Sequence, residues 1–196
     1  MAVVLVDAGG TNIGSVRYAL QRLGTDAALT SDPETIRAAS HVILPGVGAA
    51  GPGMRRLRDA GLVDVLRGLT QPVLGVCLGM QLLCERSEEG DTECLGVIPA
   101  PVRHFAVAPG LRVPHMGWNA LRVAATHPLV VDLRDGDSAY FVHSYAVPTG
   151  AYTIAESDHG GTFAAIVANG NFMGMQFHPE RSADVGARLL RNFLLS

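Results

Sequence analysis

Three short apolar runs in the first half of the chain, each followed by an amphipathic segment, most constrain its fold. The runs are AVVLVDAG, HVILPGVG and PVLGVC, and the segments after them cover Asn12 to Leu23, Met54 to Leu69 and Leu78 to Arg86. Continuous runs of valine, isoleucine and leucine are typical of strands buried on both faces, and helices usually cover such strands. The first half therefore predicts parallel strands flanked by helices.

The second half of the chain carries four short apolar runs separated by turn residues. They are AYFVHSYAVP, YTIAESDHG, TFAAIVANG and NFMGMQFHPE. Runs joined by turns such as Asn169-Gly170-Asn171 favour hairpins. Asp184 to Leu195 then has the spacing of an amphipathic helix. We therefore expect a single α/β domain over residues 1–196, with an open mixed sheet, mainly parallel and flanked by helices, and antiparallel additions in the second half.

The composition excludes several classes of function. The net charge is -3, and all 15 basic residues are arginine. A weakly acidic chain offers no electrostatic attraction to nucleic acid. Without lysine it has neither a Schiff-base lysine for pyridoxal phosphate nor a Walker A lysine. No apolar run reaches the roughly 18 residues of a membrane helix, so no membrane partner is expected. Three cysteines are too few for a disulfide framework, which favours the cytoplasm.

One cysteine lies in the sequence Gly75-Val76-Cys77-Leu78-Gly79, between a predicted strand and a predicted helix. Small residues on both sides suit a nucleophile elbow, because the backbone of the nucleophile is crowded there. Such a corner would point the thiol from the carboxyl edge of the sheet, beside a helix N-terminus that favours the thiolate. The competing interpretation is a small buried core residue. We interpret Cys84 and Cys94 in that way, and since their spacing to histidines suits no zinc site, no metal is expected.

The sequence QFHPE supplies groups that could activate this thiol. His178 can serve as the base, and Glu180 would lie on the same side of an extended backbone and orient the imidazole. An anionic intermediate would also need hydrogen-bond donors. One candidate is the N–H of Leu78, directly after the nucleophile, and the other is the N–H of Val47 in LPGVG, at the end of another predicted strand.

A nucleotide-binding loop is a further candidate, because AGGTNIG supplies glycines after the first predicted strand. Gly9, Gly10 and Gly14 do not fit the Gly-x-Gly-x-x-Gly pattern of dinucleotide-binding loops. Those glycines more simply allow a tight turn at the edge of the sheet. No cofactor is therefore expected.

In this order, LPGVG, GVCLGMQLL and QFHPERS resemble the class I (triad) glutamine amidotransferases, which have a flavodoxin-like fold. VPHMGWN and FVHSYAVP narrow the resemblance to the glutaminase subunits of imidazole glycerol phosphate synthases, over nearly the whole chain. The resemblance implies that Cys77, His178 and Glu180 hydrolyse glutamine to glutamate and ammonia. In a heterodimer, the ammonia would pass to a (β/α)8-barrel cyclase subunit, which makes imidazole glycerol phosphate and AICAR in histidine biosynthesis.

The resemblance also implies a set of residues that hold the glutamine substrate. They are Gly48, Gln81, Glu89, His143, Ser144 and Tyr145. Other interpretations stay open for some of them. Gln81 could lie on a helix surface, Tyr145 could be a core aromatic, and a shift of one residue would exchange Glu89 for Glu88.

The partner interface is implied in the same way, at Asn12, Met116, Trp118 and Asn119. Large aromatic side chains often anchor interfaces, although Trp118, the only tryptophan, could instead belong to the core. Many family members have Asp-Tyr-Gly-x-Gly-Asn near the N-terminus, whereas this chain has DAGGTN from Asp7 to Asn12. That departure concerns the partner interface and leaves the chemistry unchanged.

Two other functions compete with this one. The chain could be a glutaminase that serves another ammonia acceptor, for example in making anthranilate or pyridoxal phosphate. It could also be a non-catalytic binding or regulatory module on the same fold. PHMGWN and FVHSYAVP argue against the first alternative, and the intact Cys77, His178 and Glu180 argue against the second.

Overall fold

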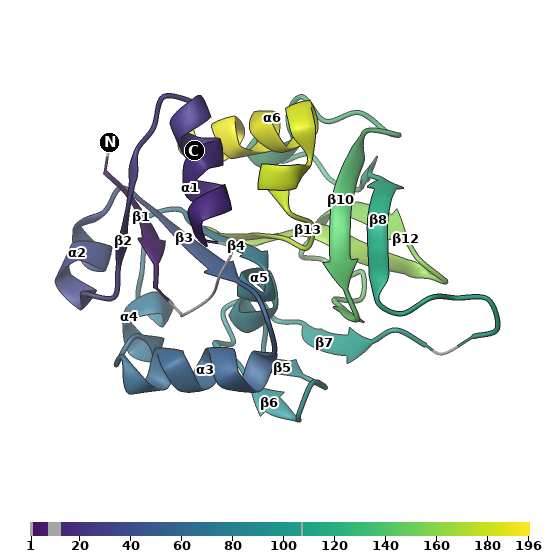
Figure 1. The fold of residues 1–196 in the computed structure, drawn as a ribbon, viewed down its shortest axis with the longest axis horizontal. Coiled ribbons are helices and arrows are strands. Elements are labelled where there is room, and N and C mark those ends of the chain that lie inside the picture. Colours follow the sequence, from purple (N-terminus) through teal and green to yellow (C-terminus); the bar gives the residue numbers. More distant parts are fainter. Residues whose placement is uncertain (1, 8–12, 107) are drawn as a thin grey trace.

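The computed structural model describes residues 2–7, 13–106 and 108–196. Within them, an eight-stranded mixed sheet forms the centre of the fold, in the order β2-β1-β3-β4-β14-β13-β12-β9 (Figure 1). The strands are β1 (Val3–Val6), β2 (Ala27–Thr30), β3 (His41–Gly46), β4 (Val73–Cys77), β9 (Arg122–Val123), β12 (Thr153–Asp158), β13 (Thr162–Asn169) and β14 (Phe172–Met175). Strands β1 to β4 and β14 pair in parallel, and β13, β12 and β9 extend the sheet antiparallel. The predicted mainly parallel sheet with antiparallel additions is confirmed.

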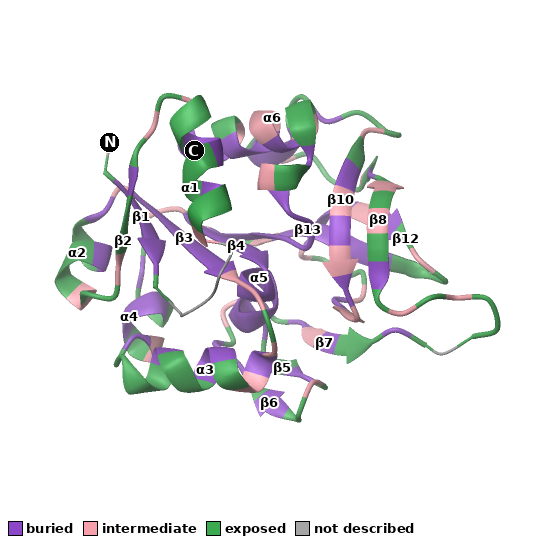
Figure 2. Ribbon diagram, viewed as in Figure 1, coloured by how far each residue is buried: buried purple, intermediate pink, exposed green. Residues whose placement is uncertain are grey.

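Helices cover both faces of this sheet. They are α1 (Ile13–Arg22), α2 (Pro33–Ala38), α3 (Ala50–Asp59), α4 (Val63–Arg67), α5 (Leu78–Leu83) and α6 (Ala183–Leu194). One apolar cluster joins α1 and α6 to Leu5, Ile43 and Leu74, and the other joins α2 to α5 to Val4 and Val42. Neighbouring strand residues point to opposite faces, so β1, β3 and β4 each contribute to both clusters. Figure 2 shows these inner strands as buried.

Two predicted helices have different ends in the structure. The segment expected from Met54 to Leu69 is two helices, α3 and α4, because Gly61 adopts a φ of 68° and ends α3. Its N–H donates to the Arg58 carbonyl, and the Leu62 N–H donates to that of Leu57, which satisfies the end of the helix. The helix expected from Leu78 to Arg86 ends at Leu83.

Beyond Leu83 the backbone turns to pair with later strands. Strand β5 (Arg86–Ser87) pairs with β6 (Thr92–Glu93) and with β7 (Pro101–His104), which in turn pairs with β11 (Tyr145–Ala146). Within the described residues this is a separate four-stranded sheet. It brings Tyr145 alongside the helix that follows Cys77.

A third, two-stranded sheet joins β8 (His115–Ala120) and β10 (Ser138–His143) in antiparallel register. Two short 3-10 helices, η1 (Pro128–Val130) and η2 (Pro179–Arg181), complete the fold. The amphipathic segment expected from Asp184 is α6, and the turn at Asn169 to Asn171 joins β13 and β14 in a hairpin as predicted. No helix of the described residues is long and apolar enough to cross a membrane.

Candidate active site

Cys77 is the last residue of β4, and α5 begins at the next residue. Its φ of 54° and ψ of -112° lie in a region of backbone conformation that residues other than glycine rarely adopt. This backbone conformation costs on the order of 1–3 kcal/mol and is typical of functional sites. The predicted elbow is therefore present, and Cys77 is 8% exposed.

The glycines around Cys77 are needed because backbone segments touch there. A Cβ on Gly79 would overlap the carbonyl oxygen of Leu44, and a Cβ on Gly75 would lie 2.6 Å from the carbonyl oxygen of Gly79. A Cβ on Gly46 would lie 2.5 Å from the Gly79 nitrogen. The start of α5 therefore rests directly on the ends of β3 and β4, and only glycine fits at the contact points.

His178 and Glu180 form a buried pair beside this corner. The Nδ1 of His178 and the Oε1 of Glu180 are 2.8 Å apart, and the two side chains are 9% and 0% exposed. The expected geometry was wrong in one respect. Glu180 lies in the 3-10 turn η2 and not on an extended strand, because Pro179 starts that turn. The backbone of His178 is held by a hydrogen bond from its N–H to the Tyr140 carbonyl.

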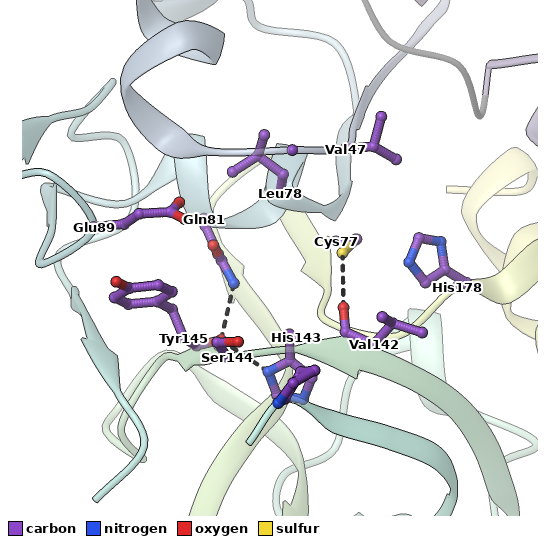
Figure 3. A pocket seen from close by; sticks show the side chains of 12 residues that line it. Val47, Cys77, Leu78, Gln81, Glu89, Val142, His143, Ser144, Tyr145 and His178 are labelled. Carbon is purple, nitrogen blue, oxygen red and sulfur yellow. Dashed lines mark hydrogen bonds between the residues drawn. The ribbon is translucent and has the colours of Figure 1, made fainter. Parts of the chain in front are cut away.

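The electrostatics of His178 favour the imidazolium. Burial acts to lower the pKa of His178, but hydrogen bonds to Cys77 and Glu180, and the negative charges of these groups, act in the opposite direction. The net effect raises the pKa of His178 to about 10. Since Nδ1 is occupied by Glu180, the second ring nitrogen is the one available to the sulfur. Figure 3 shows the imidazole beside Cys77.

A cavity of about 300 Å³ opens in front of the sulfur (Figure 3). Its lining combines the ends of β3, β4 and β10 with the start of α5 and the two loops that carry Glu89 and His178. The lining residues are Val47, Gly48, Cys77, Leu78, Gln81, Glu89, Pro114, Val142, His143, Ser144, Tyr145 and His178. The structure thus brings together every residue that the sequence assigned to the substrate and to the anionic intermediate.

Gln81 presents an oxygen to this cavity, since its amide nitrogen is used elsewhere. Its Nε2 donates to the carbonyl of Tyr145 at 3.0 Å and to the Oε1 of Gln176 at 2.8 Å. Both N–H groups are then occupied, and the remaining oxygen can only accept. Gln81 is 4% exposed, so it is not a helix-surface residue.

The two adjacent glutamates occupy different places. Glu89 lines the cavity, and its Oε2 accepts a hydrogen bond from the N–H of Ala50 at 2.7 Å. The Oε2 of Glu88 instead accepts from the N–H of His104 at 2.9 Å. Glu89 is therefore the carboxylate that a ligand of this cavity would meet.

Two residues near the sulfur were not predicted from the sequence. The Sγ of Cys77 lies 3.9 Å from the carbonyl oxygen of Val142 and 3.9 Å from the Nε2 of Gln176. Val142 carries no polar side chain and gave no signal. Gln176 did give one, because it is a polar residue within the otherwise apolar run FMGMQF.

A chain of neutral histidines lies beneath the cavity. The Nδ1 of His143 donates to the Tyr145 carbonyl at 2.8 Å, which leaves its Nε2 to accept from the Nδ1 of His115 at 3.0 Å. The Nε2 of His115 then accepts from the side-chain amide of Asn119 at 3.2 Å. The Tyr145 carbonyl can only accept, which fixes the proton of His143 on Nδ1. That in turn fixes the proton of His115 on its own Nδ1. Burial chiefly lowers the pKa of His143 to about 3 and that of His115 to about 4.

These two histidines make the protein less stable in mild acid. Above about pH 6.5 they are neutral in both the folded and the unfolded chain, so they contribute nothing there. Below it only the unfolded chain takes up their protons, and His143 alone costs about 2 kcal/mol at pH 5. We expect the free energy of unfolding in urea to fall between pH 6.5 and 5. His178 offsets little of this loss, because its raised pKa stabilises the folded chain fully below about pH 6.5 and that contribution changes mainly between about pH 6.5 and 10.

The matched variant is His143→Gln, whose amide can still donate to Tyr145 and accept from His115. It should remove roughly half of the fall in unfolding free energy between pH 6.5 and 5, since His115 remains. A wild-type curve that is already flat in this range would contradict the assignment of neutral histidines.

The surface beside the cavity exposes large apolar side chains. Met116 and Trp118 on β8 are 63% and 55% exposed, and Asn119 is half-buried. Trp118 makes an edge-on contact with Tyr140 at a centroid distance of 6.0 Å. Its exposure rules out the alternative that it is a core residue. Asn12, the fourth residue assigned to this surface, lies outside the described residues.

The remaining cysteines are buried, as interpreted from the sequence. Burial raises the pKa of the Cys84 thiol well above its usual range and that of Cys94 to about 11. Within residues 2–7, 13–106 and 108–196, His, Cys, Asp and Glu side chains form no group that could hold a metal ion.

A cysteine elbow at the carboxyl edge of a parallel sheet, with a His–Glu pair beside it, defines the class of triad amidotransferases. The model of the family described as glutamine amidotransferase class-I matches residues 4–196. A solved structure described as "Crystal structure of glutamine amidotransferase" has a TM-score of 0.77 at 22% identity, covering 100% of this chain and 98% of the other. A solved structure of PurLQS from Thermotoga maritima has a TM-score of 0.73 at 19% identity, covering 99% of this chain and 97% of the other. These two structures establish the fold.

Curated relatives are much more similar in sequence. The imidazole glycerol phosphate synthase subunit HisH of Xanthomonas euvesicatoria pv. vesicatoria (strain 85-10) is 60% identical over 98% of this chain and 96% of its own length. HisH of Xylella fastidiosa (strain Temecula1) is 56% identical over the same shares. This chain belongs to the class-I glutamine amidotransferase family, and within it to the HisH subunits of imidazole glycerol phosphate synthase.

Proposed function

We propose that this chain hydrolyses glutamine to glutamate and ammonia and delivers the ammonia to a (β/α)8-barrel cyclase subunit. There the ammonia would be used to make imidazole glycerol phosphate and AICAR in histidine biosynthesis. The observation that carries the proposal is the Cys77 thiol, held at a positive-φ corner within hydrogen-bonding reach of His178, whose other nitrogen bonds Glu180. Residues 1–196 would act as one amidotransferase domain in the cytoplasm.

The reaction divides into two halves at the sulfur. The Cys77 thiolate attacks the side-chain carboxamide carbon of glutamine, and the imidazolium of His178 gives its proton to the departing nitrogen, which leaves as ammonia. A glutamyl thioester remains on the sulfur. His178 then takes a proton from water, the resulting hydroxide attacks the thioester carbon, and glutamate leaves as the thiolate reforms.

Glu180 keeps His178 ready for both halves. Its carboxylate fixes the proton on Nδ1 and stabilises the positive charge of the ring, without accepting the proton itself. The raised pKa of His178 has the same origin, since its interactions with Cys77 and Glu180 both stabilise the protonated ring. We therefore propose that His178 is protonated at rest, ready to give its proton to the departing nitrogen.

The anionic intermediates need donors on the side of the cavity opposite the imidazole. Leu78, as the first residue of α5, has an N–H without a partner inside the helix. Val47 and Gly48, directly after β3, lie on the same wall. We assign the N–H groups of Leu78 and Val47 to the oxyanion, and removing one such donor typically lowers kcat by about 10²- to 10³-fold.

The polar wall of the cavity suits the two ends of glutamine. Glu89 and the oxygen of Gln81 are acceptors, which favours the α-ammonium group. Gly48 and the segment His143-Ser144-Tyr145 would enclose the rest of the substrate. None of these assignments requires a cofactor or a metal.

The exposed face of β8 is the partner surface that we propose. Met116 and Trp118 supply apolar area there, and an open depression beside them is lined by Pro114, His115 and Asn119. Asn12 is assigned to this surface from the sequence alone. Pro114 also lines the cavity at Cys77, so the proposed partner surface adjoins the site where ammonia forms.

A glutaminase assay with and without the cyclase subunit tests the proposal. Hydrolysis of glutamine by the full chain should rise sharply when the cyclase and its phosphoribosyl substrate are added. An unchanged rate in a mixture shown to contain the complex would contradict the assigned partner, and no hydrolysis in any mixture would contradict the activity.

Trp118→Ala tests the partner surface in the same assay. We expect the cyclase concentration for half-maximal activation to rise roughly tenfold, since exposed tryptophans often dominate interfaces. The control is Val131→Ala, which removes another exposed apolar side chain at the end of η1. Equal effects of the two variants, or a large drop in the melting temperature of Trp118→Ala, would refute the interface role.

A further inference from the structure

We propose that Gln176 is a further residue of the reaction centre: its side-chain amide donates to the Cys77 sulfur and ties that sulfur, through Gln81, to the substrate wall. The catalytic role of Gln176 rests on the proposed function. The contact itself is a property of the structure.

Strand register places Gln176 opposite the nucleophile. Met175, the last residue of β14, pairs with Val76 of β4, so the residues that follow them, Gln176 and Cys77, lie side by side. Met175 and Phe177 belong to the apolar cluster under α1 and α6. Alternation along the extended chain therefore directs the side chain of Gln176 to the opposite side, towards α5.

The orientation of the Gln176 amide is fixed by its neighbours. Its Oε1 accepts from the Nε2 of Gln81 at 2.8 Å, so its own Nε2 must be the end that faces Cys77. That nitrogen lies 3.9 Å from Sγ, within the range of hydrogen bonds to sulfur. Gln176 is 0% exposed, and its backbone N–H is bonded to the Ala165 carbonyl. The amide cannot turn away without losing the bond from Gln81.

The contacts of the sulfur distinguish its two protonation states. A thiol can donate to the Val142 carbonyl, which lies 3.9 Å away. A thiolate gains nothing from that carbonyl, but it does gain from the N–H of Gln176. Gln176 therefore favours the reactive form.

Gln81 connects this contact to the substrate. Its nitrogen bonds both Gln176 and the Tyr145 carbonyl, while its oxygen faces the cavity. The side-chain amides of Gln81 and Gln176 therefore connect the proposed ammonium site to the nucleophile through hydrogen bonds. Gln176 acts as a catalytic residue through its contact with the sulfur and as a positioning residue through Gln81.

The test is alkylation of Cys77 in the full chain by iodoacetamide, followed across pH by mass spectrometry. In Gln176→Met, which keeps length and burial but has no N–H, alkylation at neutral pH should slow roughly tenfold, and its pH profile should move to higher pH. The value of kcat for glutamine hydrolysis should fall by a similar factor. Cys84 and Cys94 are buried, and a Cys77→Ser chain identifies any signal that they give.

Gln71→Met is the matched control. Gln71 also uses its amide in internal hydrogen bonds, at 3.0 Å to the Ile36 carbonyl, but it lies away from the site. Its alkylation profile should equal that of the wild type. If Gln176→Met does not fold, Gln176→Asn replaces it, because the shorter amide cannot reach both Gln81 and the sulfur.

A folded Gln176 variant with the wild-type alkylation profile would overturn the inference. A wild-type chain whose Cys77 is alkylated but which never hydrolyses glutamine would instead count against the proposed function. The alkylation comparison would still decide the role of Gln176, so the two failures are distinguishable.

Discussion

Cys77→Ala should abolish glutamine hydrolysis, with a loss of about 10⁴-fold or more, because the reaction then has no nucleophile for the carboxamide carbon. Alanine fits the same corner, since it adds no atom beyond Cβ. The free energy of unfolding should therefore stay within about 1 kcal/mol of the wild type. Ammonia supplied from solution should still support the cyclase in the complex, because only the source of ammonia is lost.

Cys84→Ala is the control for this experiment. Cys84 is fully buried in the apolar cluster under α5, and its Sγ donates to the Met80 carbonyl. The same substitution there should leave glutamine hydrolysis within about twofold of the wild type. Substantial glutaminase activity in Cys77→Ala, measured as glutamate release, would refute the central assignment.

Gly79→Ala should cost more stability than any other conservative change at this site. The new methyl group would overlap the carbonyl oxygen of Leu44, which is backbone in the middle of the sheet and cannot move aside as a flexible side chain can. We expect a loss of at least about 3 kcal/mol in the free energy of unfolding. Activity should fall further than stability alone requires, because α5 must shift and take Leu78 with it.

Gly14→Ala is the matched control on a helix. A Cβ there meets only the ring of Tyr18 at 4.0 Å. Alanine is the better helix former by about 1 kcal/mol, so this variant should be as stable as the wild type or more so. Urea unfolding of the two variants provides the comparison. A Gly79→Ala chain within about 1 kcal/mol of the wild type would show that the corner can relax.

The sequence could predict those parts of the site that depend on a few adjacent residues. Gly75 to Gly79 specified the corner, because a glycine requirement is local and depends on the backbone alone. The strands came from their apolar runs in the same way. The split at Gly61 could not be predicted, since a glycine within an amphipathic pattern ends a helix only when the next segment packs differently.

The parts that could not be predicted depend on contacts between distant segments. His178 and Glu180 were expected to meet along a strand, whereas Pro179 folds them into a turn. The contact of Gln176 with Cys77 joins residues 99 positions apart and follows only from the pairing of β14 with β4. The different positions of Glu88 and Glu89 likewise depend on distant segments, because Glu89 accepts from the N–H of Ala50 and Glu88 accepts from that of His104.

The position of β14 has a consequence for how the enzyme is made. This strand, one of the last in the sequence, lies between β4 and β13, and the imidazole follows directly after it. During synthesis the thiol leaves the ribosome about a hundred residues before His178, its proposed base, does. A nascent chain therefore has no reactive cysteine–histidine pair until its final strand has inserted into the sheet, and activation of the thiol marks the end of folding.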